Sequence, residues 1–209
     1  LYARKRSPGL PSSNRFSLIG SLRTIMKDTD EAVRLAISLM AVSARTAPKG
    51  KGKDSIVTRT VLNSDRSLLS LEMIRYGNEH SQPFFVRDGK NIAASDACLL
   101  IGARGYEPLG LNCHGCGFGS CAEMEASRDQ APVKGPPFAG PNCIIKMTDL
   151  GIAVGSAAKT ASLLNLDNRI MYTAGVAGLS LGWMESCSVA YGIPVSVTGK
   201  SIFFDRPVG

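Results

Sequence analysis

The chain has 209 residues, of which 44% are hydrophobic and 20% charged, so it can form a domain with its own core and is not intrinsically disordered. No apolar run approaches the ~18 residues of a membrane-spanning helix, which excludes an integral membrane protein. The net charge of +7 does not indicate nucleic-acid binding, because residues 1–25 carry five of the 24 basic side chains and no acid, and the remainder is nearly neutral.

Residues 1–25 differ from the rest of the chain, because they are rich in Ser, Pro and Arg and contain no acidic residue. Such a leader resembles a transit peptide in composition, but it has no apolar stretch long enough for a secretory signal. Directly after it, Asp28 and Glu31 form an acidic variant of the capping box, and apolar residues then recur at helical spacing. We therefore expect a helix over residues 28–45, with residues 1–25 outside the fold and residues 26–209 forming a single domain.

The rest of the chain predicts a mixture of strands and helices. In chain order we predict a strand over residues 55–62, a helix over 65–79, and short strands over 84–86 and 97–101. After a segment rich in Gly and Pro, we predict helices over residues 143–166 and 172–185 and strands over 189–198 and 202–204. The run at 97–101 contains only apolar residues, which is typical of a strand buried on both faces. Strands and helices that mix without a strict βαβ rhythm predict an α+β domain.

Four of the six cysteines lie in the Gly-rich segment 105–143, in the pattern Cys-x2-Cys-x4-Cys-x21-Cys. Their positions are Cys113, Cys116, Cys121 and Cys143. A disulfide framework is disfavoured, because the chain has an adequate core and no secretory signal. A structural zinc site is usually built from two Cys-x2-Cys units, of which this segment has one, so zinc is the weaker alternative.

The cysteine spacing favours a [4Fe–4S] cluster, which commonly takes three thiolates from one tight loop and the fourth from a distant segment. Gly115, Gly117 and Gly119 suit such a loop, because glycine tolerates positive φ and close approach of a bulky group. Their backbone N–H groups could also donate hydrogen bonds to cluster sulfides. The two remaining cysteines, Cys98 and Cys187, are expected to be buried structural thiols.

Two basic turns that contain glycine are candidates for binding a phosphate group, from FMN or another nucleotide. The first is the turn 49–53, with Lys49, Lys51 and Lys53, and the second is the Thr-Gly-Lys-Ser sequence that contains Lys200. The alternative for each of them, a solvated surface turn, is favoured by the sequence alone. The first is not a P-loop, because it lacks the required spacing and the Lys-Ser/Thr ending.

The predicted helix 143–166 carries small residues on one side. Gly151 and Gly155 lie four residues apart, with several alanines nearby. Small residues at this spacing permit close approach of another helix, from the same chain or from a second subunit. The alternative is a helix buried in the core, because the segment is apolar nearly all round.

Further motifs extend over the chain after the leader. They occupy residues 43–52, 112–121, 140–143, 149–160, 167–170, 192–194, 198–200 and 203–206. Together they resemble a family of uncharacterised ferredoxin-domain proteins of anaerobic bacteria and archaea, over about residues 26–206. The cysteine loop by itself is similar to the small [4Fe–4S] module of corrinoid iron–sulfur proteins. These resemblances imply a cluster held by the four cysteines in an anaerobic organism.

The order of two segments is similar to that of flavin-dependent nitroreductases. Arg45 begins an Arg-Thr-Ala-Pro sequence after the first helix, where that family has a loop that touches FMN, and the Gly/Ala-rich stretch 149–166 follows later. Lys49 stands where the family has Ser, and the family's Asn-Gln-Pro-Trp stretch is absent. The resemblance implies a nitroreductase-like mixed sheet with flanking helices, an inserted Cys-rich iron–sulfur loop, an FMN phosphate near Arg45, and a site at the interface of a homodimer.

These observations predict an iron–sulfur redox protein, either an electron carrier or an oxidoreductase, with FMN as a candidate second cofactor. Its partner would be a redox protein or a small-molecule electron acceptor, and we expect neither a nucleic acid nor a membrane as partner. Six cysteines without an export signal indicate the cytoplasm. The alternatives are a metal-stapled binding or scaffold protein and an accessory factor for cofactor assembly, neither of them catalytic.

Overall fold

A four-stranded sheet lies at the centre of the computed structural model, which describes residues 13–130 and 137–204. In spatial order the strands are β1 (Ile56–Val61), β2 (Ala97–Ala103), β4 (Val189–Ser196) and β3 (Asp167–Asn168). Each of the three strand pairs is antiparallel, whereas we expected a mixed sheet.

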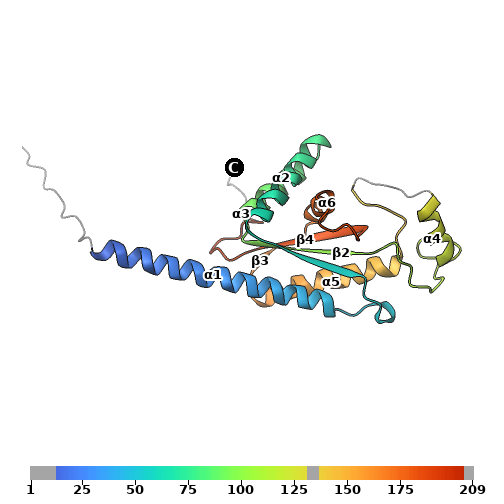
Figure 1. The fold of residues 1–209 in the computed structure, drawn as a ribbon, viewed down its shortest axis with the longest axis horizontal. Coiled ribbons are helices and arrows are strands. Elements are labelled where there is room, and N and C mark those ends of the chain that lie inside the picture. Colours follow the sequence, from blue (N-terminus) through green and yellow to red (C-terminus); the bar gives the residue numbers. More distant parts are fainter. Residues whose placement is uncertain (1–12, 131–136, 205–209) are drawn as a thin grey trace, which may run out of the picture.

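Helices cover both faces of the sheet (Figure 1). The lower face in that view carries α1 (Ser13–Thr46) and α5 (Ile144–Leu163). The upper face carries α2 (Asn63–Glu79), α3 (Pro83–Ala94) and α6 (Tyr172–Ser180). This arrangement confirms the predicted α+β class. Within the described ranges, no helix combines the length and the apolar content needed to cross a membrane.

Strand β2 packs against both helical layers, because successive side chains of a strand point to opposite faces of the sheet. Leu99 and Ile101 belong to the core cluster that contains side chains of α1 and α5. Cys98 and Leu100 belong to the cluster that contains side chains of α2, α3 and α6. Every residue of β2 is buried, which confirms the prediction of a strand enclosed on both faces.

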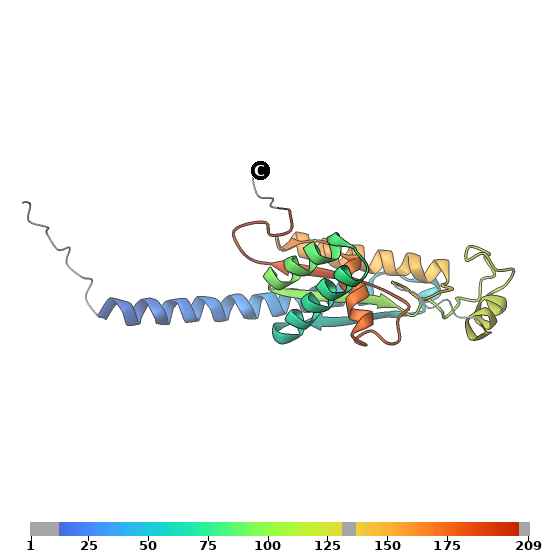
Figure 2. The same cartoon turned by 90° about the horizontal axis from the view of Figure 1, so that it is seen from above.

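Helix α1 begins at Ser13, well before the predicted start at residue 28. The capping-box residues therefore lie inside the helix, and residues 21–27 contain no Gly or Pro that would interrupt it. Figure 2 shows the N-terminal half of α1 projecting beyond the sheet. The domain boundary after residue 25 stays a prediction, and residues 1–12 of the predicted extension lie outside the described residues.

The predicted strand at 84–86 is wrong, because these residues belong to α3. Pro83 lies in the first turn of the helix, where its missing N–H leaves no intrahelical bond unmade. Phe85, Gly89 and Ile92 are buried at spacings of four and three residues, which is the period of a helix. The aromatic residues suggested a strand, but the longer apolar period determines the structure.

The predicted final strand at 202–204 is also wrong. After β4 the chain turns away from the sheet, and residues 202–204 form a turn. The backbone N–H of Ile202 donates to the Asp167 carboxylate at 2.7 Å, so a side chain satisfies this donor where a strand would use a neighbouring backbone.

Candidate metal centre and its basic neighbour

The cysteine-rich segment 105–143 leaves and rejoins the body of the protein at one narrow point, which we call the neck. The backbone N–H of Cys143 donates to the carbonyl of Gly105 at 2.7 Å, so the two ends of the segment are hydrogen-bonded to each other. The hydroxyl of Ser188 accepts from the Gly105 N–H at 3.1 Å and donates to Asn142 Oδ1. A Cβ on Gly105 would lie 2.6 Å from Ser188 Oγ, so only glycine fits at the neck.

Within residues 112–121 of the segment, three residues with positive φ fold the cysteine loop back on itself. The φ angles are 46° at Asn112, 59° at His114 and 88° at Gly117. The Gly117 N–H donates to the His114 carbonyl at 2.9 Å and closes a tight turn. This agrees with the expectation that a Gly-rich sequence here forms a compact loop, although two of the three residues are not glycines.

The loop ends in α4 (Cys121–Gln130), a helix that we did not predict. Ser120 Oγ accepts from the Glu123 N–H at 3.1 Å, and Glu123 Oε2 accepts from the Gly119 N–H at 3.0 Å. This reciprocal pair resembles a capping box, and the Ser-x-x-Glu sequence that forms it was the signal that would have revealed the helix. It places Cys121 in the first turn of α4. Helix α4 lies at the end of the molecule opposite the N-terminal half of α1 (Figure 1).

The four predicted ligands lie in different environments. Cys143 is the N-cap residue of α5 and is buried in an apolar cluster against which Cys116 packs. Cys121 is partly buried, and Cys113 is exposed. All six cysteines of the chain are free thiols.

Backbone donors converge on the Cys121 thiol. The Asn112 N–H lies 3.4 Å from its sulfur. This contact lowers the pKa of Cys121, and the N–H groups of Gly110 and Leu111 and the positive charge of Lys51 act in the same direction. The local environment therefore favours the thiolate, which is the form that ligates metal.

The residues that the structure describes contain no group of three or more His, Cys, Asp or Glu side chains arranged to hold a metal ion. The donor set nevertheless fits an iron–sulfur cluster in its chemistry. Four free thiols belong to one segment, two of them meet in one apolar cluster, and a third receives backbone N–H donors. Thiolate ligands and N–H donors to sulfur are what such clusters require.

A basic turn lies beside the cysteine segment. It consists of η1 (Gly50–Gly52) with its flanking residues Lys49 and Lys53. A Cβ on Gly50 would lie 2.7 Å from Leu109 Cδ2 and 2.8 Å from Ile145 Cγ2, so the turn is in contact with the segment and with the start of α5. The fold therefore brings the basic turn 49–53 next to the cysteine segment 105–143, although the two are far apart in the sequence.

The predicted phosphate ligands of this region are not equally available. The Lys49 ammonium donates to the carbonyl of Ala47 at 2.8 Å and also to that of Arg45, and only 6% of its side chain is exposed. The Arg45 guanidinium donates to the Ile56 carbonyl at 3.0 Å and also pairs with Asp54 at 3.1 Å.

Lys51 and Lys53 are exposed, and they lie on the same short turn. Their side chains are therefore the accessible cations of this turn.

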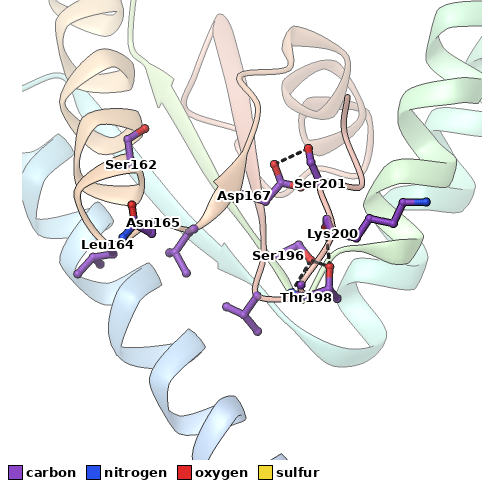
Figure 3. Close-up of a pocket in the computed structure, with 11 residues that line it drawn as sticks. Ser162, Leu164, Asn165, Asp167, Ser196, Thr198, Lys200 and Ser201 are labelled. Carbon is purple, nitrogen blue, oxygen red and sulfur yellow. Dashed lines mark hydrogen bonds between the residues drawn. The ribbon is translucent and has the colours of Figure 1, made fainter. Parts of the chain in front are cut away.

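Lys200 lies elsewhere, in a pocket of about 650 Å³ beyond the C-terminal end of α5 (Figure 3). There Asp167 accepts from the Ser201 hydroxyl at 3.0 Å and orders the loop. The turn is bound to α5 at Asp149, and the pocket begins at Ser162, so the length of helix between them is about 20 Å. Within one chain, Lys200 and the turn 49–53 therefore cannot contact the same phosphate.

Comparison with known proteins gives two kinds of similarity. An uncharacterized protein of Archaeoglobus fulgidus is 44% identical over 177 residues, which is 85% of this chain and 93% of the relative. Residues 139–206 also match the model of a family described as uncharacterized proteins containing a ferredoxin domain. That match includes Cys143 and begins after the other three predicted ligands.

Among solved structures, the fold is similar to a nitroreductase with bound FMN from Desulfitobacterium hafniense DCB-2. The TM-score is 0.51 at 14% sequence identity, and the match covers 79% of this chain and 78% of that chain. This similarity confirms the predicted nitroreductase-like fold class. At such low identity it concerns the fold alone.

Proposed function

The chain belongs to the family of uncharacterized proteins containing a ferredoxin domain, and from that premise we propose that it is a redox protein with one [4Fe–4S] cluster. The proposed ligands are Cys113, Cys116, Cys121 and Cys143. When bound, the cluster would supply one-electron transfer. The partner would be a redox protein or a small-molecule electron acceptor.

The observation that carries this proposal is the convergence of backbone donors on Cys121 within a segment of four free thiols. Backbone N–H groups directed at a sulfur atom stabilise a thiolate ligand, and an ordinary surface loop does not require them. Cys143 also supports the proposal, because it is the N-cap residue of α5 and its thiolate would be stabilised by the positive end of the helix dipole.

FMN is a second candidate cofactor, supported by the nitroreductase-like fold. Lys51 and Lys53 are the side chains proposed to meet its phosphate, because Lys49 and Arg45 are engaged within the chain. A homodimer is part of this proposal, since Lys200 could reach such a phosphate only from a second copy. Binding of FMN to the reconstituted protein that is unchanged by neutralising Lys51 and Lys53 would contradict it.

The competing function is a scaffold in which a metal only holds the segment 105–143 together. The two proposals differ in what the purified protein contains. Anaerobic purification should give a brown protein with iron and acid-labile sulfide. A colourless protein with one zinc and no sulfide would refute the redox proposal and support the scaffold.

Single Ser variants test the ligands. Each variant should lower the iron content and loosen the segment 105–143. The variants are Cys113→Ser, Cys116→Ser, Cys121→Ser and Cys143→Ser. Matched controls are Cys98→Ser and Cys187→Ser, which change buried thiols outside the segment and should keep full iron. Full iron in all four ligand variants would show that the assignment is wrong.

We also propose that the protein works in the cytoplasm of a cell with little oxygen. The cysteine loop is largely exposed, so a cluster held there would be open to oxidants. Exposure of the brown protein to air should bleach it rapidly. A visible absorption that survives days of aeration would contradict a cluster on this loop.

A further inference from the structure

We propose that an aromatic pocket between α2, α3 and α6 binds an uncharged, bicyclic aromatic molecule that carries hydrogen-bonding atoms on its edge. The pocket has a volume of about 280 Å³ and lies outside the basic turn 49–53 and the cysteine loop 112–121. Its lining residues are Tyr76, His80, Gln82, Phe85, Pro137 and Tyr172. This inference goes beyond the proposed function and does not depend on the cluster.

The wall of the pocket is a series of aromatic rings in contact with one another. The ring centroids of Tyr76 and His80 lie 4.2 Å apart, and those of Tyr76 and Phe85 lie 4.5 Å apart. Tyr172 meets Phe85 edge-on, with 5.6 Å between the centroids. Such separations are typical of favourable aromatic pairs. The rings therefore form one continuous apolar surface against which a flat ligand can pack.

The last turn of α2 and the start of α3 bring these rings together. Tyr76 and His80 are four residues apart, so they lie on the same side of the chain at the end of α2. Gly77 lets α3 approach closely, because a Cβ there would lie 2.9 Å from Phe85 Cβ. Ser81, with a φ of 53°, lies in the turn that joins the two helices. Backbone packing therefore fixes this side of the pocket.

Tyr172, the first residue of α6, is held by contacts on both sides of it. Met171 exchanges two backbone hydrogen bonds of 2.8 Å with Gly192 of β4. The buried Thr173 hydroxyl donates to the buried Asp88 carboxylate of α3 at 2.9 Å. The start of α6 is thus tied to the sheet and to α3. A pocket whose walls are fixed in this way loses little conformational freedom when a ligand binds.

Polar atoms in the pocket are left for a ligand to bind. Within the part of the chain that the structure describes, no hydrogen bond acts on the hydroxyl of Tyr76 or of Tyr172. Gln82 is the N-cap residue of α3, yet its side chain makes no capping hydrogen bond. Tyr76 is only 9% exposed, and a buried tyrosine hydroxyl usually has a partner. A packed core alone does not explain these groups, whereas a polar edge of a ligand would satisfy them.

Charge and volume define the class of ligand. The described lining contains no Lys, Arg, Asp or Glu, so a charged ligand would be buried without a counter-ion, which is costly. The pKa values of Tyr76 and Tyr172 are raised, chiefly by burial, so both hydroxyls stay protonated and can donate at neutral pH. A cavity of about 150 Å³ holds one benzene ring, so a pocket of about 280 Å³ suits a bicyclic molecule.

The test is a saturation-transfer NMR titration of the full chain with quinazolin-4-one, an uncharged bicyclic molecule with an N–H and a carbonyl on its edge. The probe should bind with a Kd of about 1 mM or below. Tyr76→Phe and Gln82→Ala each remove a polar group from the pocket and should weaken binding about two- to tenfold. Tyr172→Leu removes a ring from the wall and should weaken it further.

Tyr191→Phe is the matched control. The Tyr191 ring is partly buried and lies 6.5 Å from that of Phe138, but Tyr191 does not line the pocket. Its variant should keep the Kd of the wild type. No saturable binding to the wild type, or a loss in Tyr191→Phe equal to that in Tyr76→Phe, would overturn the inference.

Two further probes test the class of ligand. The first is 1-naphthoate, a bicyclic anion, and the second is tetramethylammonium, a cation of the kind that aromatic cages bind. Both should bind at least about tenfold more weakly than quinazolin-4-one. Binding of either that is as tight would refute an uncharged ligand. Iron and sulfide contents do not enter these measurements, so a failure here is distinct from a failure of the proposed function.

Discussion

Replacement of Gly151 and Gly155 by alanine should stabilise the protein. Both residues lie in the interior of α5, and a Cβ added at either position would have no atom within 4 Å. Glycine in a helix interior costs about 0.8–1.0 kcal/mol relative to alanine, so the double variant should gain about 2 kcal/mol. For a chain of this length that corresponds to a rise in Tm of about 4–8 °C.

Thermal unfolding followed by circular dichroism, in matched anaerobic buffers, measures this difference. Gly175→Ala is the contrasting variant, because a Cβ at Gly175 of α6 would overlap the backbone of β4 at Ala190. It should lose about 1–3 kcal/mol or more through overpacking. A double α5 variant that is less stable than the wild type, or that changes from dimer to monomer, would refute the reasoning. That result would mean that another helix, supplied by a second copy, lies against the glycines.

Two further predictions concern titrating groups. The pKa of Glu72 is lowered, chiefly by its hydrogen bond from Arg75 and also by one from Ser180, so its stabilising contribution is present above about pH 4.5 and lost as the pH falls through the lowered value. Glu72→Gln should therefore flatten the loss of stability in acid, measured by urea unfolding at several pH values; an unchanged acid slope would contradict this. Burial raises the pKa of Cys98, so iodoacetamide should leave this thiol unmodified in the folded protein. Peptide mapping that finds Cys98 labelled before unfolding would show that β2 opens.

The parts of the fold that were predictable are those in which a local pattern and the tertiary environment agree. The uninterrupted apolar run of β2 reflects its burial between two helical layers, so the run alone indicates the strand. In α3 the two signals conflict, because Phe84 and Phe85 have strand propensity while Phe85, Gly89 and Ile92 recur at helical spacing. The longer period prevailed because it is the one that buries a continuous face.

The candidate site was predictable to a similar extent. Cysteine spacing identified one segment, and the structure shows Cys116 and Cys143 in one apolar cluster. The spacing did not reveal that the Lys49 ammonium is bound within the chain while Lys51 is exposed on the same turn. The turn that carries both lysines is held by Asp149, which accepts a hydrogen bond from Gly50 and is 99 residues away from it in the sequence. No local pattern encodes a contact of that range.

The neck has a consequence for how such a chain can change over evolutionary time. Because Gly105 and Cys143 are hydrogen-bonded to each other, the residues between them form one closed loop attached to the body of the protein at the neck. The entropy of closing a loop rises only by about 0.6 kcal/mol for each doubling of its length. The insert could therefore lengthen, shrink or exchange its contents at little cost to the body of the protein. The proposed cluster site would therefore lie in the part of the chain that can change most freely, while the sheet and its helices stay the same.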